Sequence, residues 1–90
     1  MKMNGTHQLT LANLDLSGIS TDEQWRKVLE ELDEFAAARN PEEQSEEGFD
    51  LFQAMHGLML KLGINMEAAN ERHLQKMASA DHERKRLGHV

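Results

Sequence analysis

Acidic residues at short, regular spacing are the part of this sequence best suited to chemistry. Glu31 and Glu34 stand three positions apart, and Glu47 and Asp50 repeat that spacing further along the chain. If both stretches are helical, residues three apart project from the same side, so each pair presents two carboxylates together. Glu47 also falls within the apolar stripe of its stretch, where a carboxylate must be protonated, paired or bound to a cation.

Crowded carboxylates of this kind suit magnesium, which prefers hard oxygen ligands and keeps several of its waters. Two helices packed antiparallel would bring the two pairs together around one or two Mg²⁺ ions, with Mn²⁺ as a substitute. Glutamate is also common on solvated helix faces, so the spacing leaves a plain surface role open. Taken one by one, several neighbouring acids are better explained as surface residues, namely Glu30, Asp33, Glu42 and Glu46.

Capping residues predict three helices that would carry these acids. A polar cap with Glu three positions later, Pro at the first helical position and Gly just past the end are the expected boundary signals. The sequence places such signals at Ser20 with Glu23, Asn40 with Pro41 and Glu43, Gly63, and Asn65. They predict a first helix from the Ser20 cap to about Arg39, a second from Pro41 to Leu62, and a third from Met66 to about Ala80.

The predicted fold class is therefore all-α, a chain of three helices forming a helical bundle. We expect a partly ordered arm over residues 1–19, a helical domain over 20–80 and a charged tail over 81–90. The second helix is apolar around most of its circumference, because its main stripe is widened by Phe49, Phe52, Met59 and Leu60. Three helices of one chain can hardly cover such an element, so we expect dimerisation to complete the bundle.

Composition narrows the functional classes. The chain has 90 residues, a formal net charge of -6 and no cysteine. The negative charge disfavours nucleic-acid binding, and an acidic protein that handles nucleotides would need metal ions to bridge like charges. No apolar run approaches the roughly 20 residues that span a bilayer, and the N-terminus lacks a signal-peptide pattern. We expect a cytoplasmic protein without a membrane partner.

Two acidic motifs in order also carry a resemblance to a known family. Residues 30–34 read EELDE and match the pattern EExxE, while residues 47–50 read EGFD and match ExxD. Residues 62–69, LGINMEAA, look like a turn of the form LGIxxEEA into the next helix. Over roughly Trp25 to Met77 the chain resembles the all-alpha nucleoside triphosphate pyrophosphohydrolases, especially short MazG-like members of the kind found in phage genomes.

The resemblance implies a reaction and a ligand set. It implies Mg²⁺-dependent hydrolysis between the α and β phosphates of a nucleoside triphosphate, which releases a monophosphate and pyrophosphate. The magnesium ligands would be Glu31, Glu34, Glu47 and Asp50. Glu30 completes the motif and would orient ligands or help to activate water, so Glu30 and Glu34 are the predicted catalytic residues. The protein would act as a homodimer or a dimer of dimers.

Substrate contacts follow less directly, because the chain departs from the family after the third helix begins. Where family members often carry a KxxKN stretch, this chain has His73 in the place of a common lysine, retains Lys76, and has Met77 instead of the asparagine. Lys76 and His73 are the predicted phosphate contacts. Trp25 sits on the core face of the first helix, and the resemblance leaves open a place for it near the base.

Two alternatives remain. The departure at Met77 allows an inactive or altered relative of the family. The chain could also be a catalytically silent helical dimer that serves as an interaction or regulatory module, with acids that only confer solubility.

Overall fold

The computed structural model describes residue 5 and residues 7–86, apart from the side chains of residues 85 and 86. Over that part of the chain it contains three α-helices and no strand: α1 (Thr21–Ala37), α2 (Pro41–Lys61) and α3 (Met66–Arg86). The all-α prediction is confirmed. The chain divides into two compact units, one spanning Thr10–Ile64 and the other holding α3 with the N-terminal residues up to Leu9.

The predicted capping residues begin all three helices. The Ser20 hydroxyl accepts from the Glu23 amide at 3.0 Å, the Asn40 side chain accepts from the Glu43 amide at 2.9 Å, and Asn65 accepts from Ala68 at 3.0 Å. Each bond satisfies one of the amides that a helix N-terminus leaves without an intrahelical partner.

The ends of α1 and α2 show why the chain turns where it does. α1 stops at Ala37, two residues before the predicted end, and Ala38 is already extended. α2 ends in a Schellman motif, in which the Gly63 amide donates to Leu60 at 3.0 Å and the Ile64 amide donates to Met59 at 3.1 Å. Gly63 has φ of 73°, a left-handed conformation that a residue without a side chain adopts at little cost.

α3 is longer than the sequence predicted. The helix continues to Arg86, whereas the residues after Ala80 were expected to form part of a charged tail. The composition of this stretch supports helix, because Glu, Lys and Arg are good helix formers. Arg84 pairs with Asp81 one turn earlier at 3.3 Å, and its positive charge near the C-terminus suits the helix dipole.

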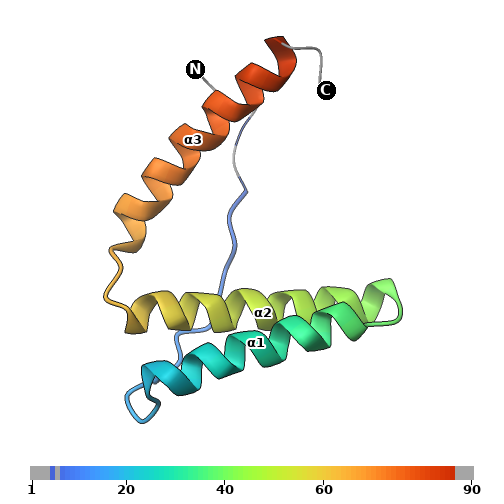
Figure 1. Ribbon diagram of the computed structural model, residues 1–90, viewed down its shortest axis with the longest axis vertical. Coiled ribbons are helices and arrows are strands. Elements are labelled where there is room, and N and C mark those ends of the chain that lie inside the picture. The colour runs from blue at the N-terminus through green and yellow to red at the C-terminus, as the bar shows by residue number, and fades with distance from the viewer. Residues whose placement is uncertain (1–4, 6, 87–90) are drawn as a thin grey trace. The chain divides into compact units, whose positions relative to one another are not determined.

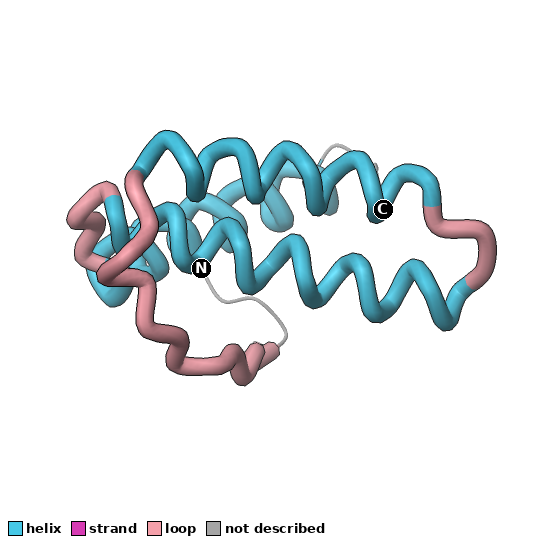
Figure 2. Tube along the Cα trace, turned by 90° about the horizontal axis from the view of Figure 1, so that it is seen from below, coloured by secondary structure: helices cyan, strands magenta, loops and turns pink. Residues whose placement is uncertain are grey.

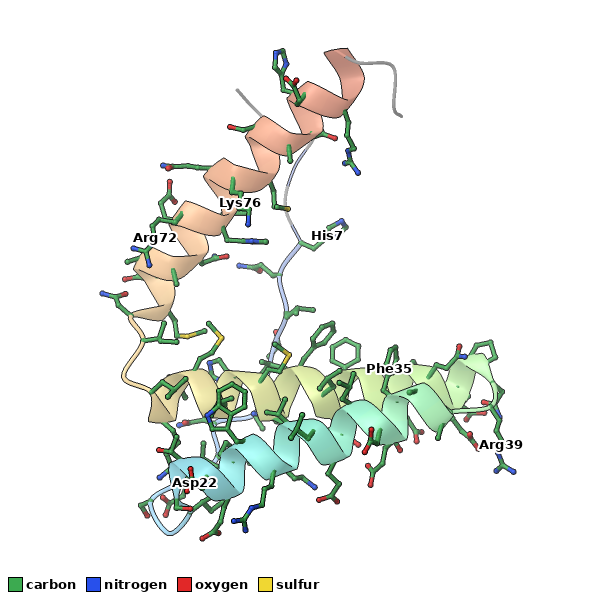
Figure 3. All side chains as sticks on the ribbon, in the orientation of Figure 1. His7, Asp22, Phe35, Arg39, Arg72 and Lys76 are labelled. Atoms are coloured by element: carbon green, nitrogen blue, oxygen red, sulfur yellow. The ribbon has the colours of Figure 1, made fainter. Side chains whose placement is uncertain are left out.

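Within the first unit, α1 and α2 run antiparallel and lie side by side, joined by residues 38–40 (Figures 1 and 2). Figure 3 shows Asp22 in the first turn of α1 and Arg39 in the turn that leads to α2. Ala54 and Leu58 of α2 are buried between these elements. The interface also buries two polar side chains of α1, Gln24 and Glu31. The helix pair is thus unusually polar where the helices meet.

The segment before α1 is fixed to α2 by one side chain. Gln53 accepts from the Ala12 amide at 2.8 Å and donates to the Ala12 carbonyl at 3.0 Å. These two hydrogen bonds reproduce the backbone pairing of two neighbouring β-strands. The Ile19 amide closes a turn onto the Leu16 carbonyl at 3.1 Å. Within the segment predicted as a partly ordered arm, Ala12 is thus hydrogen-bonded to α2, and a Leu16 methyl group lies close to Gly57 of α2.

Large apolar side chains remain exposed on the helix pair. Leu29 is 57% exposed and Phe49 is 50% exposed, and their neighbours are similarly open. The exposed set on α1 and α2 comprises Trp25, Leu29, Leu32, Phe35, Phe49, Phe52, Met55, Leu60 and Leu62. On α1, helical periodicity puts Trp25, Leu29, Leu32 and Phe35 on the side away from Lys27 and Glu34. On α2, it puts Phe52, Met55 and the C-cap residue Leu62 on the side away from Gln53 and Gly57, whereas Phe49 lies on the same side as Leu60. We call these seven residues, without Phe49 and Leu60, the apolar face. None of the described helices is long and apolar enough to cross a membrane.

Candidate metal centre

Five of the predicted site residues come together where α1 and α2 pack. Carboxylate oxygens of Glu31, Glu47 and Asp50 lie within 4.8 Å of one another, and oxygens of Glu30, Glu31 and Glu34 form a second group of the same size. Glu31 belongs to both groups. We call the five acids the carboxylate cluster. The two motifs, separate in sequence, therefore converge on one buried side chain.

Glu31 is the centre of this cluster and is almost completely buried. Its side chain is 6% exposed, and one carboxylate oxygen receives the Lys27 ammonium group at 2.8 Å. The hydrogen bond from Lys27 raises the pKa of that lysine. No hydrogen-bond donor in the described part of the chain reaches the other oxygen, Oε2. A buried carboxylate with one oxygen unpaired is expensive unless a further positive group binds it.

Glu47 on α2 carries a second unpaired oxygen. Its Oε2 is buried, and it too lacks a hydrogen-bond donor among the residues that the structure describes. The sequence predicted that the Glu47 carboxylate requires a partner, and no described residue donates a hydrogen bond to its Oε2. Gly48, the next residue, lets α1 approach here, because a side-chain carbon at this position would lie 3.3 Å from the Phe35 ring.

Glu34 shows the electrostatic effect of the crowding. Repulsion from Glu31 raises the pKa of the Glu34 carboxyl, with smaller contributions from desolvation and from Glu47. A proton on Glu34 can also be shared with either neighbour. The cluster therefore favours either a bound proton or a bound cation.

The donor set fits a hard divalent cation. It offers carboxylate oxygens only, two of them buried and unpaired, next to the more exposed Glu30, Glu34 and Asp50. Magnesium and manganese prefer such oxygen ligands and retain water on their open side. Lys27 is the nearest described cation to Glu31 and would compete with a metal for it.

A cleft of about 500 Å³ opens beside the cluster and shares Glu31 and Asp50 with it. We call it the side cleft. Residues 12–19 form one wall, and the remainder comes from the start of α1 and the C-terminal half of α2. Sequence reasoning missed its polar residues, which are Asn13, Glu23, Gln24, Lys27, Gln53 and His56. His56 of α2 is half-buried where it lines the cleft.

The predicted substrate contacts belong to both compact units. Trp25 belongs to the apolar face, is 49% exposed and does not line the side cleft. His73 and Lys76 are exposed on α3, in the other compact unit, where Figure 3 shows Lys76 one turn beyond Arg72. Lys27, which the sequence did not single out, is the basic residue in direct contact with the cluster.

Comparison with known proteins adds no assignment, since no family model, curated protein or solved structure matches the chain.

Proposed function

We propose that the protein is a magnesium-dependent nucleoside triphosphate pyrophosphohydrolase that releases a monophosphate and pyrophosphate. One observation carries the proposal: two buried carboxylate oxygens, on Glu31 and Glu47 of the cluster of five acids, accept no hydrogen bond from any residue that the structure describes. Such oxygens are stabilised by a hard divalent cation. The acidic motifs that resemble the MazG-like family supply the substrate class and the reaction.

In this proposal Glu31, Glu34, Glu47 and Asp50 hold the metal. Bound Mg²⁺ would neutralise the triphosphate and lower the pKa of an attacking water. The side chains of the cluster would hold the metal in place and accept a proton from water. Glu31 and Glu47 fix the site because they are held between the helices, whereas the exposed Glu30 and Glu34 can take a proton from water.

The decisive assay measures pyrophosphate release from a panel of ribo- and deoxyribonucleoside triphosphates with magnesium. Glu34→Gln and Glu47→Gln should each lower turnover by about 100-fold or more, because each removes a metal-binding group. Glu46→Gln is the matched control, since Glu46 is an exposed acid on α2 outside the cluster. The proposal fails if no nucleotide is hydrolysed, or if both cluster variants match the parent.

The apolar face supports a second proposal, that the protein acts as a homodimer. Soluble monomers rarely expose contiguous apolar patches this extensive. In its described part α3 has three large apolar residues, Met66, Leu74 and Met77, and so offers little surface of this kind. A second copy of the helix pair supplies a matching face. Self-association would build a helical bundle from two hairpins.

The same face also supports the rival function, a catalytically silent interaction module. Thermal melting separates the two functions. A ligand that binds the folded state stabilises it by RT ln(1 + [L]/Kd), so millimolar Mg²⁺ or Mn²⁺ should raise the Tm of the parent but not of Glu47→Gln. No shift in the parent would favour the silent module, and a shift without turnover would indicate a nucleotide-binding pseudoenzyme.

A further inference from the structure

The side cleft has an acidic end and a wall that is partly aliphatic. Glu31 and Asp50 form the end that it shares with the carboxylate cluster, and Lys27 lies at the boundary. Away from that end the lining combines aliphatic side chains, Leu14, Leu16, Ile19 and Leu60, with the polar side chains of Asn13, Glu23, Gln24, Gln53 and His56. Its volume is in the range typical of pockets that bind small organic molecules.

Gln24 is, with Glu31, one of the two buried polar residues of this cleft. It is 5% exposed, and its Nε2 donates to the Ala54 carbonyl at 2.9 Å. That bond fixes the carboxamide with the amide nitrogen toward α2, so the carbonyl oxygen and the second N–H are the groups left for a ligand. A fixed carboxamide beside aliphatic side chains is suited to orienting a ligand.

Gly57 makes room for this arrangement. A side-chain carbon at Gly57 would lie 2.9 Å from the Gln24 Nε2 and 3.0 Å from a Leu16 methyl carbon. α1 and the residue 12–19 wall can approach α2 this closely only because the position has no side chain. Gln53 holds the same wall from the other side through its two bonds to Ala12. The cleft is therefore preformed by contacts within one compact unit.

We propose that the side cleft receives the nucleoside part of the nucleotide whose phosphates lie at the carboxylate cluster, and that Gln24 is a specificity-determining contact. The inference rests on the proposed function and extends it. The phosphates must lie at the Glu31 end, because cations can gather there and Lys27 adds a positive charge. The nucleoside then extends along the partly aliphatic wall, where Gln24 offers hydrogen bonds to its polar edge.

The test compares ligands with and without an organic part. Isothermal titration with Mg²⁺ measures the affinity of α,β-methylene nucleoside triphosphates, which resist hydrolysis at the proposed bond, and of inorganic tripolyphosphate. At least one nucleotide should bind about tenfold or more tightly than tripolyphosphate. Gln24→Leu should remove most of that difference, since one hydrogen bond contributes about 1 kcal/mol or about fivefold in affinity and an unpaired polar edge on the ligand costs more.

Gly57→Ala tests the shape of the cleft independently, because its methyl group displaces Gln24 or Leu16. Both variants should keep the parent's affinity for tripolyphosphate and its Tm shift with Mn²⁺. Gln44→Leu, at an exposed position on α2 outside the cleft, is the matched control and should bind like the parent. If Gly57→Ala does not fold, Gln24→Leu alone decides.

Three kinds of result would overturn the inference. They differ in whether they also contradict the nucleotide substrate or the metal centre. Equal affinity for nucleotides and tripolyphosphate, or a preference that survives both variants, rejects the cleft as the nucleoside site and leaves the proposed function standing. Binding of neither ligand, with the Mn²⁺ shift retained, rejects the nucleotide as substrate. If Mn²⁺ does not raise the Tm of the parent, the metal centre is rejected as well.

Discussion

Individual carboxylates at the cluster are arranged for binding rather than for stability. Glu31 is buried with one oxygen on Lys27 and the other unpaired, and Glu34 stands close enough for mutual repulsion. A protein under selection for stability alone would gain by replacing one of these acids with a neutral residue. The cluster therefore predicts that removing a charge stabilises the metal-free protein while it weakens metal binding.

Glu34→Gln tests whether removing a charge stabilises the metal-free protein and weakens metal binding. Because the pKa of Glu34 is raised in the folded state, its repulsion is absent at low pH and develops as pH rises through that pKa, so the parent loses stability over this range. The variant should lack this loss and should melt at a higher temperature than the parent near pH 7 without metal. With Mg²⁺ the order should reverse. Melting curves across pH, with and without Mg²⁺, measure both effects, and Glu46→Gln should show neither.

Lys27→Met tests the ion pair between Lys27 and Glu31. Removing the ammonium group leaves Glu31 buried without a partner, which should cost about 1–2 kcal/mol, below the usual value for a buried pair because Lys27 is half exposed. Mg²⁺ should stabilise this variant more than it stabilises the parent, since the competing cation is gone. Urea unfolding with and without Mg²⁺ measures the difference. Equal metal stabilisation in both proteins would show that Lys27 and the metal do not compete for Glu31.

At the scale of elements, helix starts were predictable and one helix end was not. Ser20, Asn40 and Asn65 cap as expected because N-cap bonds are local and visible in four consecutive residues. The end of α3 was placed at Ala80 because the following charged residues were interpreted as a tail. The helix-forming Glu, Lys and Arg of this stretch favoured helix, but the stretch has no capping residue or glycine that marks where the helix ends.

The first turn of α2 carries a prediction that depends on pH. Glu43 accepts from the Arg39 amide at 2.9 Å and from the Arg39 guanidinium at 3.2 Å, and these bonds lower the pKa of Glu43. A lowered carboxyl pKa contributes stability that is present above the usual value of 4.5 and is lost as pH falls through the lower one. Glu43→Gln should therefore reduce Tm near pH 7 and show a smaller acid-induced loss than the parent. An unchanged Tm profile between the two proteins would contradict this role.

At the scale of the whole molecule, the sequence anticipated which acids meet but not what surrounds them. Spacing on two helices was enough to bring Glu31 and Glu47 together, because an antiparallel hairpin aligns equivalent faces. The side cleft depends on residues 12–19 reaching α2 through Gln53, a contact across 41 positions that no local pattern announces. Trp25, for which the resemblance left open a place near the base, belongs to the apolar face and does not line the side cleft.

The exposed apolar face predicts that two copies of the chain associate as a dimer. Leu29 is 57% exposed in the single chain, so Leu29→Arg should change the stability of a monomer by no more than about 0.5 kcal/mol. In a dimer that buries the face, the same substitution places an unpaired charge between subunits and should shift the equilibrium to monomer. Glu46→Arg is the control, because Glu46 is exposed on α2 and lies on the side of that helix away from Phe52, Met55 and Leu62. Sedimentation equilibrium at micromolar concentration should give dimers for the parent and for Glu46→Arg, and monomers for Leu29→Arg. A folded parent that sediments as a monomer would mean that the face serves some other partner, and the bundle would then not be completed by a second copy.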